Sequence, residues 1–156
     1  MNRFAVRRVA VLGAGVMGAQ IAAALANARI PVLLFDLPSP KGPRSGVAAQ
    51  AIERLKALKP APLGHPSDLR LIQPANYDDD LAQLAGCELV IEAVVERMDI
   101  KRSLYGRVAG HVGPEAVIVS NTSGLSVDAL AESCPEALRP RFCGVHFFNP
   151  PRYMHL

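Results

Sequence analysis

Residues 9–18 read VAVLGAGVMG, a short apolar run that ends in Gly-x-Gly-x-x-Gly. Such a run is typical of a strand buried on both faces of a sheet. The sequence continues directly into AQIAAALA over residues 19–26, which has the composition of a helix. A second apolar run, VLLF over residues 32–35, is followed at once by Asp36. Strand, glycine turn, helix, strand and acid therefore follow one another as in a dinucleotide-binding unit.

The three glycines have separate roles in such a unit. Gly13 permits the tight turn, Gly15 lets the backbone approach a pyrophosphate, and Gly18 lets the helix pack closely on the strand. The start of the helix would present free N–H groups and a partial positive charge to the phosphates. The alternative is an ordinary strand–helix–strand unit in which the glycines serve only the turn. The predicted phosphate-binding residues are Gly13, Ala14, Gly15, Val16, Met17 and Gly18.

Asp36 indicates which dinucleotide would bind. A carboxylate at the end of the second strand, about 20 residues beyond the glycines, accepts hydrogen bonds from a ribose 2′-hydroxyl and repels a 2′-phosphate. We therefore predict NAD rather than NADP as the cofactor. Arg44 follows a short way along and could bring a positive charge to the same place.

Length and composition limit the class of protein. The 156 residues suffice for one domain with a substantial core, so we predict a single domain over residues 1–156. Half of the residues are hydrophobic and a fifth are charged, which favours a globular chain over a disordered one. The net charge of +3 comes from scattered basic residues, so nucleic acid is not a predicted partner.

Targeting and cysteine patterns indicate a cytoplasmic protein. Residues 1–8 lack the apolar segment of a secretory signal, and no apolar run is long enough to span a membrane. Cys87, Cys134 and Cys143 are odd in number and lack metal-binding spacing, which favours reduced thiols and no metal site. Cys143 lies in an apolar run and is predicted to be a buried structural thiol.

The rest of the chain alternates between predicted strands and helices. This alternation predicts a doubly wound, mostly parallel α/β sheet of the Rossmann type, with strand order 3-2-1-4-5-6. Two Pro-rich breaks enclose the second predicted helix, which could pack on the sheet or project as an arm. The predicted strands are 8–12, 31–35, 69–73, 88–93, 116–120 and 142–147, and the predicted helices are 16–28, 45–58, 79–85, 98–112 and 126–133.

His146 begins the sequence HFFNP, at the carboxyl end of the sixth predicted strand. Ligands of open α/β sheets bind beyond the carboxyl ends of the strands. A histidine at that place can take a proton from a hydroxyl group while hydride leaves the same carbon atom. The alternative is a structural histidine that ends the strand.

Two other polar segments follow predicted strands. The sequence SNTSG over residues 120–124 could hydrogen-bond a ligand, or it could precede a helix capped by Ser126 with Asp128 in its first turn. The sequence EAVVE over residues 92–96 leaves the fourth strand and is followed by Lys101. Glu96 and Lys101 could form a surface ion pair or flank the nicotinamide end of the cofactor.

Four segments in this order, VLGAGVMG, VIEAVVE, SNTS and HFFNP, resemble the L-3-hydroxyacyl-CoA dehydrogenases of fatty-acid β-oxidation. The resemblance covers nearly the whole chain. It implies that NAD oxidises an (S)-3-hydroxyacyl-CoA to a 3-ketoacyl-CoA, with His146 as the catalytic base and Ser123 in contact with substrate and cofactor. It also implies cofactor contacts for the glycine turn, Asp36, Glu96, Lys101 and Asn149.

The chain departs from the pattern of this family in three respects. The family places a glutamate shortly after the histidine motif, and residues 151–156 contain no carboxylate. The family's helical C-terminal domain is absent, which predicts a fragment of a longer, homo-oligomeric or multidomain protein that binds NAD but turns over poorly alone. The serine of the family's CoA-contacting arm cannot be aligned. Lys56 or Lys59 could contact the CoA phosphates, or both could lie on a solvated helix face.

Two other functions remain open from the sequence. A related dehydrogenase of a small hydroxy acid or sugar acid would share the glycine turn and a similar histidine motif. A non-catalytic NAD-binding module would need neither His146 nor Ser123, and the presence of both favours an enzyme.

Overall fold

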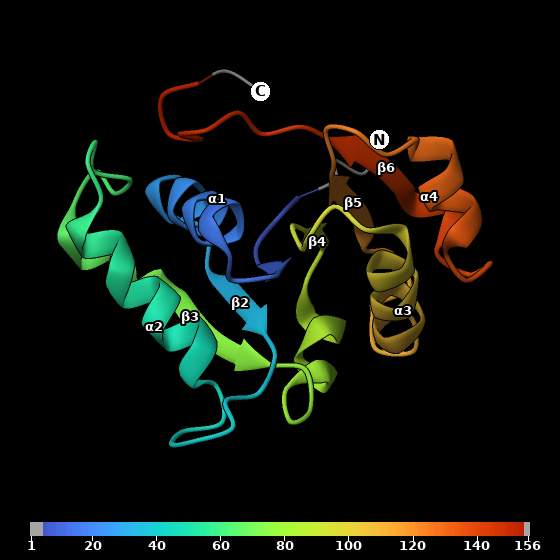
Figure 1. Cartoon of the computed structure of the whole chain (residues 1–156), viewed down its shortest axis with the longest axis horizontal. Helices are drawn as coiled ribbons and strands as arrows, with labels where there is room; N and C mark the ends of the chain where they lie inside the picture. The colour runs from blue at the N-terminus through green and yellow to red at the C-terminus, as the bar shows by residue number, and fades with distance from the viewer. Residues whose placement is uncertain (1–4, 155–156) are drawn as a thin grey trace.

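The computed structural model describes residues 5–154, in which six parallel strands form one sheet with helices on both faces (Figure 1). The strand order is β3-β2-β1-β4-β5-β6, as the sequence predicts. Outside the described part lie residues 1–4 and 155–156. The prediction that residues 1–8 carry no secretory signal therefore falls partly on residues that the structure does not describe. The elements are β1 (Val9–Leu12), α1 (Val16–Asn27), β2 (Val32–Asp36), α2 (Gly46–Arg54), β3 (Ile72–Asn76), β4 (Leu89–Glu92), α3 (Met98–Val108), β5 (Val117–Asn121), α4 (Val127–Ser133) and β6 (Phe142–Val145).

The central strands are apolar at every position because both faces of the sheet are covered. In β1, Val9 and Val11 belong to the core under α1 and α2, whereas Ala10 and Leu12 belong to the core under α3 and α4. Figure 1 shows these two helix pairs on opposite sides of the sheet. The parallel register places Val11 beside a residue of β2 on one side and of β4 on the other, so β1 forms the centre of the domain.

Two predicted elements differ in the structure. The prediction of a strand over 69–73 has the wrong bounds. Pro66–Leu71 forms a 3-10 helix, and β3 runs from Ile72 to Asn76. An edge strand can include Pro74, since a proline there removes only one hydrogen bond from the sheet. The helix predicted over 79–85 is a 3-10 helix over Leu81–Gly86.

The helix predicted over 45–58 packs on the sheet rather than projecting from it. Its α-helical part is α2, and Leu55–Ala57 continues it as a 3-10 turn. Ala48, Ala51 and Ile52 are buried in the core that α1 shares. None of the helices within residues 5–154 is both long and apolar enough to cross a membrane.

The prediction of a buried Cys143 is wrong, because this residue is exposed on β6. β6 is an edge strand with its two middle residues exposed, so an apolar run is no guide to burial there. Cys87 and Cys134 are buried free thiols. Burial raises the pKa of each to about 11, which keeps both protonated and unreactive.

Candidate functional site

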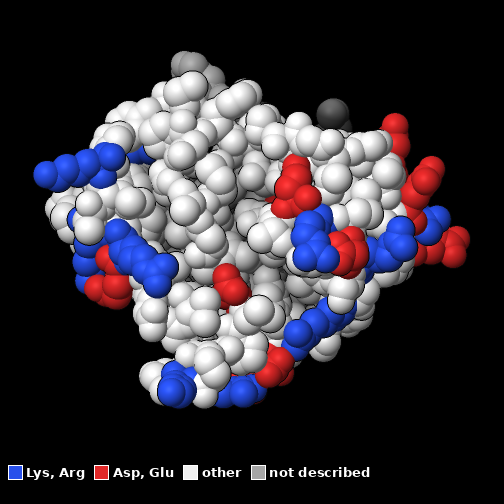
Figure 2. Space-filling view, viewed as in Figure 1, with Lys and Arg blue, Asp and Glu red and all other residues white. Residues whose placement is uncertain are grey.

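A cleft of about 1060 Å³ lies beyond the carboxyl ends of the strands. Its walls come from α3 and from the ends of all six strands and the segments that follow them, which is where open α/β sheets bind ligands. Figure 2 shows that the middle of the face is mainly uncharged, with an acidic group near the centre and most charged side chains towards the edges. The cleft brings together Gly13, Gly15, Val16, Met17, Asp36, Glu96, Ser123, His146 and Asn149.

The turn between β1 and α1 requires glycine at two positions for packing reasons. Gly13 has a φ of +105°, and a Cβ there would lie 2.8 Å from the Ala93 carbonyl oxygen. A Cβ on Gly18 would lie 1.8 Å from the carbonyl oxygen of Gly13. Gly15 differs, because a Cβ there would meet nothing within 4 Å. The protein alone does not need a glycine at Gly15, whereas a pyrophosphate close to the backbone would.

The N-terminus of α1 opens into the cleft without a side-chain cap. Gly15 is the N-cap residue and the first turn carries no acidic side chain, so these N–H groups can meet an anion. Asp36 fixes the turn, because its Oδ2 accepts a hydrogen bond of 2.6 Å from the Ala14 N–H. Its Oδ1 accepts another from the Leu37 N–H at 2.7 Å.

Tyr77 is a cleft residue that the sequence did not predict. It is buried and stacks on Phe35 with ring centroids 5.8 Å apart. Its phenolic oxygen is the one buried side-chain polar atom within residues 5–154 that lacks a hydrogen-bond partner. Burial strongly raises the pKa of Tyr77, so the hydroxyl stays protonated and can donate. An unpaired buried donor in the wall of the cleft fits a polar ligand such as a dinucleotide.

A buried ionic cluster supports the other half of the cleft. Lys101 and Glu92 are both fully buried, and their Nζ and Oε2 atoms are 2.9 Å apart. Ser120 and Tyr105 also donate hydrogen bonds to Glu92 Oε2, at 2.5 and 2.9 Å. Glu92 and Ser120 are register partners in β4 and β5, so the sheet itself sets this arrangement.

Lys101 connects that cluster to Glu96 at the cleft, with Nζ 2.9 Å from Glu96 Oε2. The other oxygen, Oε1, accepts hydrogen bonds from the Thr122 hydroxyl and from the N–H groups of Ser123 and Gly124. Burial alone would raise the pKa of Glu96, but these hydrogen bonds and the one from Lys101 lower it to about 2. Glu96 is therefore an anion that holds the turn carrying Ser123.

His146 and Asn149 follow β6 on the same wall. The His146 ring lies 4.5 Å from the Phe148 ring, centroid to centroid. Asn121, at the end of β5, accepts a hydrogen bond of 2.9 Å from the Phe147 N–H and so ties this segment to the sheet. Gln20 of α1 donates to Asn149 Oδ1 at 3.1 Å. The histidine segment is thus fixed to both the sheet and α1.

Five predicted ligand residues do not line the cleft: Ala14 and Gly18 of the glycine turn, and three lysines. Lys101 lies beneath it, because its ammonium group is enclosed by Glu92, Glu96 and Ser120. Lys56 is exposed and pairs with Glu53 at 2.6 Å, and Lys59 is exposed in the loop that follows. Both alternatives for the serine-rich segment hold in part. Ser126 caps α4, whereas Ser123 lines the cleft.

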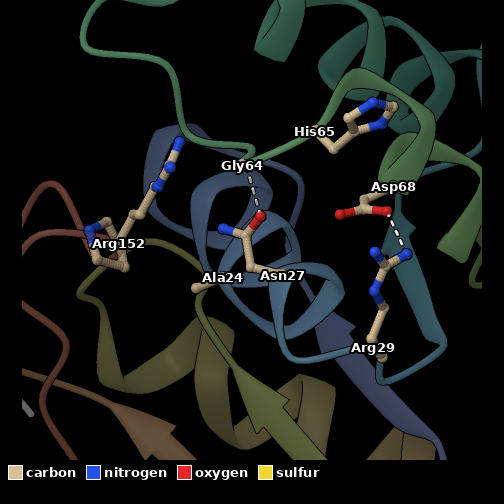
Figure 3. Close-up of a pocket in the computed structure, with 8 residues that line it drawn as sticks. Ala24, Asn27, Arg29, Gly64, His65, Asp68 and Arg152 are labelled. Carbon is tan, nitrogen blue, oxygen red and sulfur yellow. Dashed lines mark hydrogen bonds and ion pairs between the residues drawn. The ribbon is translucent and has the colours of Figure 1, made fainter.

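A second hollow of about 440 Å³ lies at the far end of α1 (Figure 3). Asn27 accepts from the Gly64 N–H there, and Arg29 pairs with the buried Asp68 at 2.7 Å. Arg152 donates to the carbonyl oxygens of Ala61 and Leu63. Through these contacts the C-terminal segment binds the loop before β3, and the loop binds the end of α1. The hollow lies about 15 Å along α1 from the glycine turn, at 1.5 Å per residue.

Comparison with known proteins identifies relatives along nearly the whole chain. Residues 8–156 match the model of a family described as "3-hydroxyacyl-CoA dehydrogenase, NAD binding domain". A Deinococcus radiodurans protein named "probable 3-hydroxyacyl-CoA dehydrogenase" is 45% identical over 152 residues, which are 97% of this chain and 44% of that protein. The fatty acid oxidation complex subunit alpha of Psychrobacter cryohalolentis is 37% identical over 97% of this chain and 21% of its own length.

A crystal structure of 3-hydroxybutyryl-CoA dehydrogenase from Escherichia coli matches the fold with a TM-score of 0.77. It is 33% identical in sequence, and the match covers 96% of this chain and 31% of that one. The chain therefore spans less than half the length of each of these relatives.

Proposed function

The chain belongs to the family of 3-hydroxyacyl-CoA dehydrogenase NAD-binding domains, and from that premise we propose that it is the cofactor-binding part of an enzyme that oxidises (S)-3-hydroxyacyl-CoA. The residues at the cleft fit the cofactor. Gly15 leaves room for a pyrophosphate, Asp36 offers a carboxylate for the adenosine ribose, and Tyr77 has an unpaired hydroxyl. NAD supplies the hydride acceptor when it is bound.

We propose that His146 accepts the proton of the substrate hydroxyl. A neutral imidazole ring suits this task near neutral pH, and in the reverse direction the protonated ring returns the proton. Ser123 would hold the same substrate oxygen by a hydrogen bond. Glu96 would act on Ser123 through the backbone, because it fixes the Ser123 and Gly124 N–H groups at 2.8 and 3.0 Å.

The observation that carries this proposal is the convergence of His146 and Ser123 on the cleft that also contains the glycine turn. These residues come from three separate strand ends. A module that only binds NAD has no need of a histidine and a serine at that place. The adjoining half of the substrate site would come from the part of the relatives that this chain does not span.

The test is the substitution His146→Gln, measured on a natural form of the protein that contains this chain and matches its relatives in length. We expect the oxidation of NADH by acetoacetyl-CoA to fall by roughly 10²–10⁴-fold, while NADH affinity stays within about twofold. His111→Gln is the matched control, since His111 is exposed and lies outside the cleft. Activity retained by the His146 variant would refute the assignment of the base.

We further propose that the substrate is a CoA ester of a fatty acid, as the names of the relatives suggest, and that the protein is multidomain or oligomeric. Neither Lys56 nor Lys59 lines the cleft, so any contact of theirs with CoA would lie outside it. The exposed free thiol of Cys143 favours a reducing compartment such as the cytoplasm, which we propose as the location of the protein.

A further inference from the structure

Asp78 forms a charged bridge just beyond β3. Its Oδ1 accepts a hydrogen bond from Arg107 Nη2, and its Oδ2 accepts one of 2.8 Å from Arg44 Nη2. One carboxylate thus pairs with two guanidinium groups, one from α3 and one from the segment before α2. Neither the glycine turn nor the histidine segment contributes to this bridge.

Arg107 belongs to the wall of the cleft, together with Asp36 and Tyr77. Its Nη2 donates to the Tyr77 carbonyl oxygen at 3.0 Å, and its guanidinium carbon lies 5.7 Å from the centre of the Tyr77 ring. The Tyr77 N–H in turn donates to the Asp36 carbonyl oxygen at 3.2 Å. Tyr77 therefore links Arg107 directly to the residue whose carboxylate would bind the adenosine ribose.

We propose that Asp78 is a specificity-determining residue that disfavours NADP by keeping Arg107 paired. A free guanidinium group at this end of the cleft would attract a ribose 2′-phosphate and hydrogen-bond to it. With Asp78 in place, a 2′-phosphate must compete with an existing ion pair for Arg107, at a site that already holds the carboxylate of Asp36. The inference rests on the proposed function in that the cleft binds NAD.

Asp79 provides a matched control one residue further along the chain. It carries the same charge and pairs with Arg44, with Oδ2 3.0 Å from Arg44 Nε. Like Asp78 it does not line the cleft, but among the ion pairs of residues 5–154 it makes no contact with Arg107. Removing its charge changes the net charge equally but leaves Arg107 paired with Asp78.

The experiment measures the affinity of the protein and its variants for NADH and NADPH by titration. Asp78→Asn is expected to raise NADPH affinity by roughly five- to tenfold, the effect of one partly exposed charge-assisted hydrogen bond. NADH affinity should stay within about twofold, because its ribose carries no 2′-phosphate. Asp79→Asn should leave both affinities within the same limit, and adding Arg107→Gln to Asp78→Asn should remove the gain.

Three results would overturn the inference. They are an unchanged ratio of NADPH to NADH affinity in Asp78→Asn, an equal gain in Asp79→Asn, or a gain that persists without Arg107. The Asp78 side chain is 38% exposed, so its replacement by asparagine should leave the fold intact, and thermal unfolding checks this. Arg107→Gln alone provides a second test, since a paired Arg107 should contribute little to NADPH affinity. Failure of the unaltered protein to bind NADH would instead refute the proposed cofactor site.

Discussion

Replacing Lys101 by methionine should destabilise the protein severely. Methionine is similar in length and apolar, so it fills the space of a side chain that is fully buried but removes its charge. The main cost arises at Glu92, which stays buried and loses the cation 2.9 Å from its Oε2. Glu96 loses a similar contact, but its side chain is 36% exposed and can be solvated.

The expected loss follows from what remains around Glu92. Breaking a buried ion pair by removing one partner costs about 3–5 kcal/mol. Ser120, Tyr105 and the Val94 N–H still donate hydrogen bonds to the carboxylate, which favours the lower end, about 3 kcal/mol. Typical domains are stable by only about 5–15 kcal/mol, so this is a large fraction of the total.

Urea unfolding at neutral pH measures the effect. With a slope of about 2 kcal/mol per molar urea, a loss of about 3 kcal/mol lowers the midpoint by about 1.5 M. Arg102→Met is the control, because Arg102 is exposed beside Lys101 and its loss should change stability by no more than about 0.5 kcal/mol. Replacing Glu92 by leucine as well should recover part of the loss, since no buried charge is then left without a partner. A loss below about 1 kcal/mol, or a double variant no more stable than Lys101→Met, would refute the reasoning.

Two further predictions concern the cleft. Gly18→Ala should weaken NADH binding by roughly tenfold or more, because the new Cβ would lie 1.8 Å from the Gly13 carbonyl oxygen. The control is Gly106→Ala in α3, where the new Cβ meets nothing within 4 Å. It should leave NADH binding unchanged and stabilise the helix by about 0.5–1 kcal/mol. Binding by Gly18→Ala equal to that of the unaltered protein, measured by titration, would contradict the packing argument. The free energy of unfolding should fall as the pH drops from about 5 towards 2. The pKa of Glu96 is lowered to about 2 in the folded protein, so its carboxylate stabilises the fold fully only above the pKa of an unfolded glutamate and loses this effect as the pH falls towards 2. Unfolding of Glu96→Gln across this pH range should show a shallower fall, and an unchanged slope would exclude Glu96 as a source of the acid sensitivity.

The glycine turn could be predicted from the sequence because its requirements are local. The strand, the turn and the helix adjoin one another in the chain, and Gly13 needs its positive φ whatever lies elsewhere. The order of the strands follows from general rules for parallel sheets and is confirmed. The start of β3 could not be predicted in this way. Leu69 and Leu71 are apolar like the residues of a buried strand, but they pack against the core from a 3-10 helix.

The site was predicted where a motif marks a residue and missed where the contact depends on the tertiary fold. Tyr77 and Arg107 carry no motif, and they meet at the cleft only because the end of β3 lies beside α3. The sequence allows Arg44 to bring a positive charge near Asp36, but in the structure Asp78 and Asp79 pair with its guanidinium group. Nothing in the local sequence around Arg44 indicates these partners, which lie more than 30 residues away in the chain.

Lys101 shows that periodicity can indicate a buried charge even where composition suggests a surface one. It lies three, four and seven residues before Leu104, Tyr105 and Val108, which is the spacing of one helix face, and those three residues are buried. Glu92 likewise ends a buried strand. A lysine on a buried helix face and a glutamate in a buried strand each need a partner of opposite charge. A buried charge pair could therefore be inferred from the sequence. Its role becomes visible only in the structure, where Lys101 also pairs with Glu96, which accepts the hydrogen bond of the Ser123 N–H.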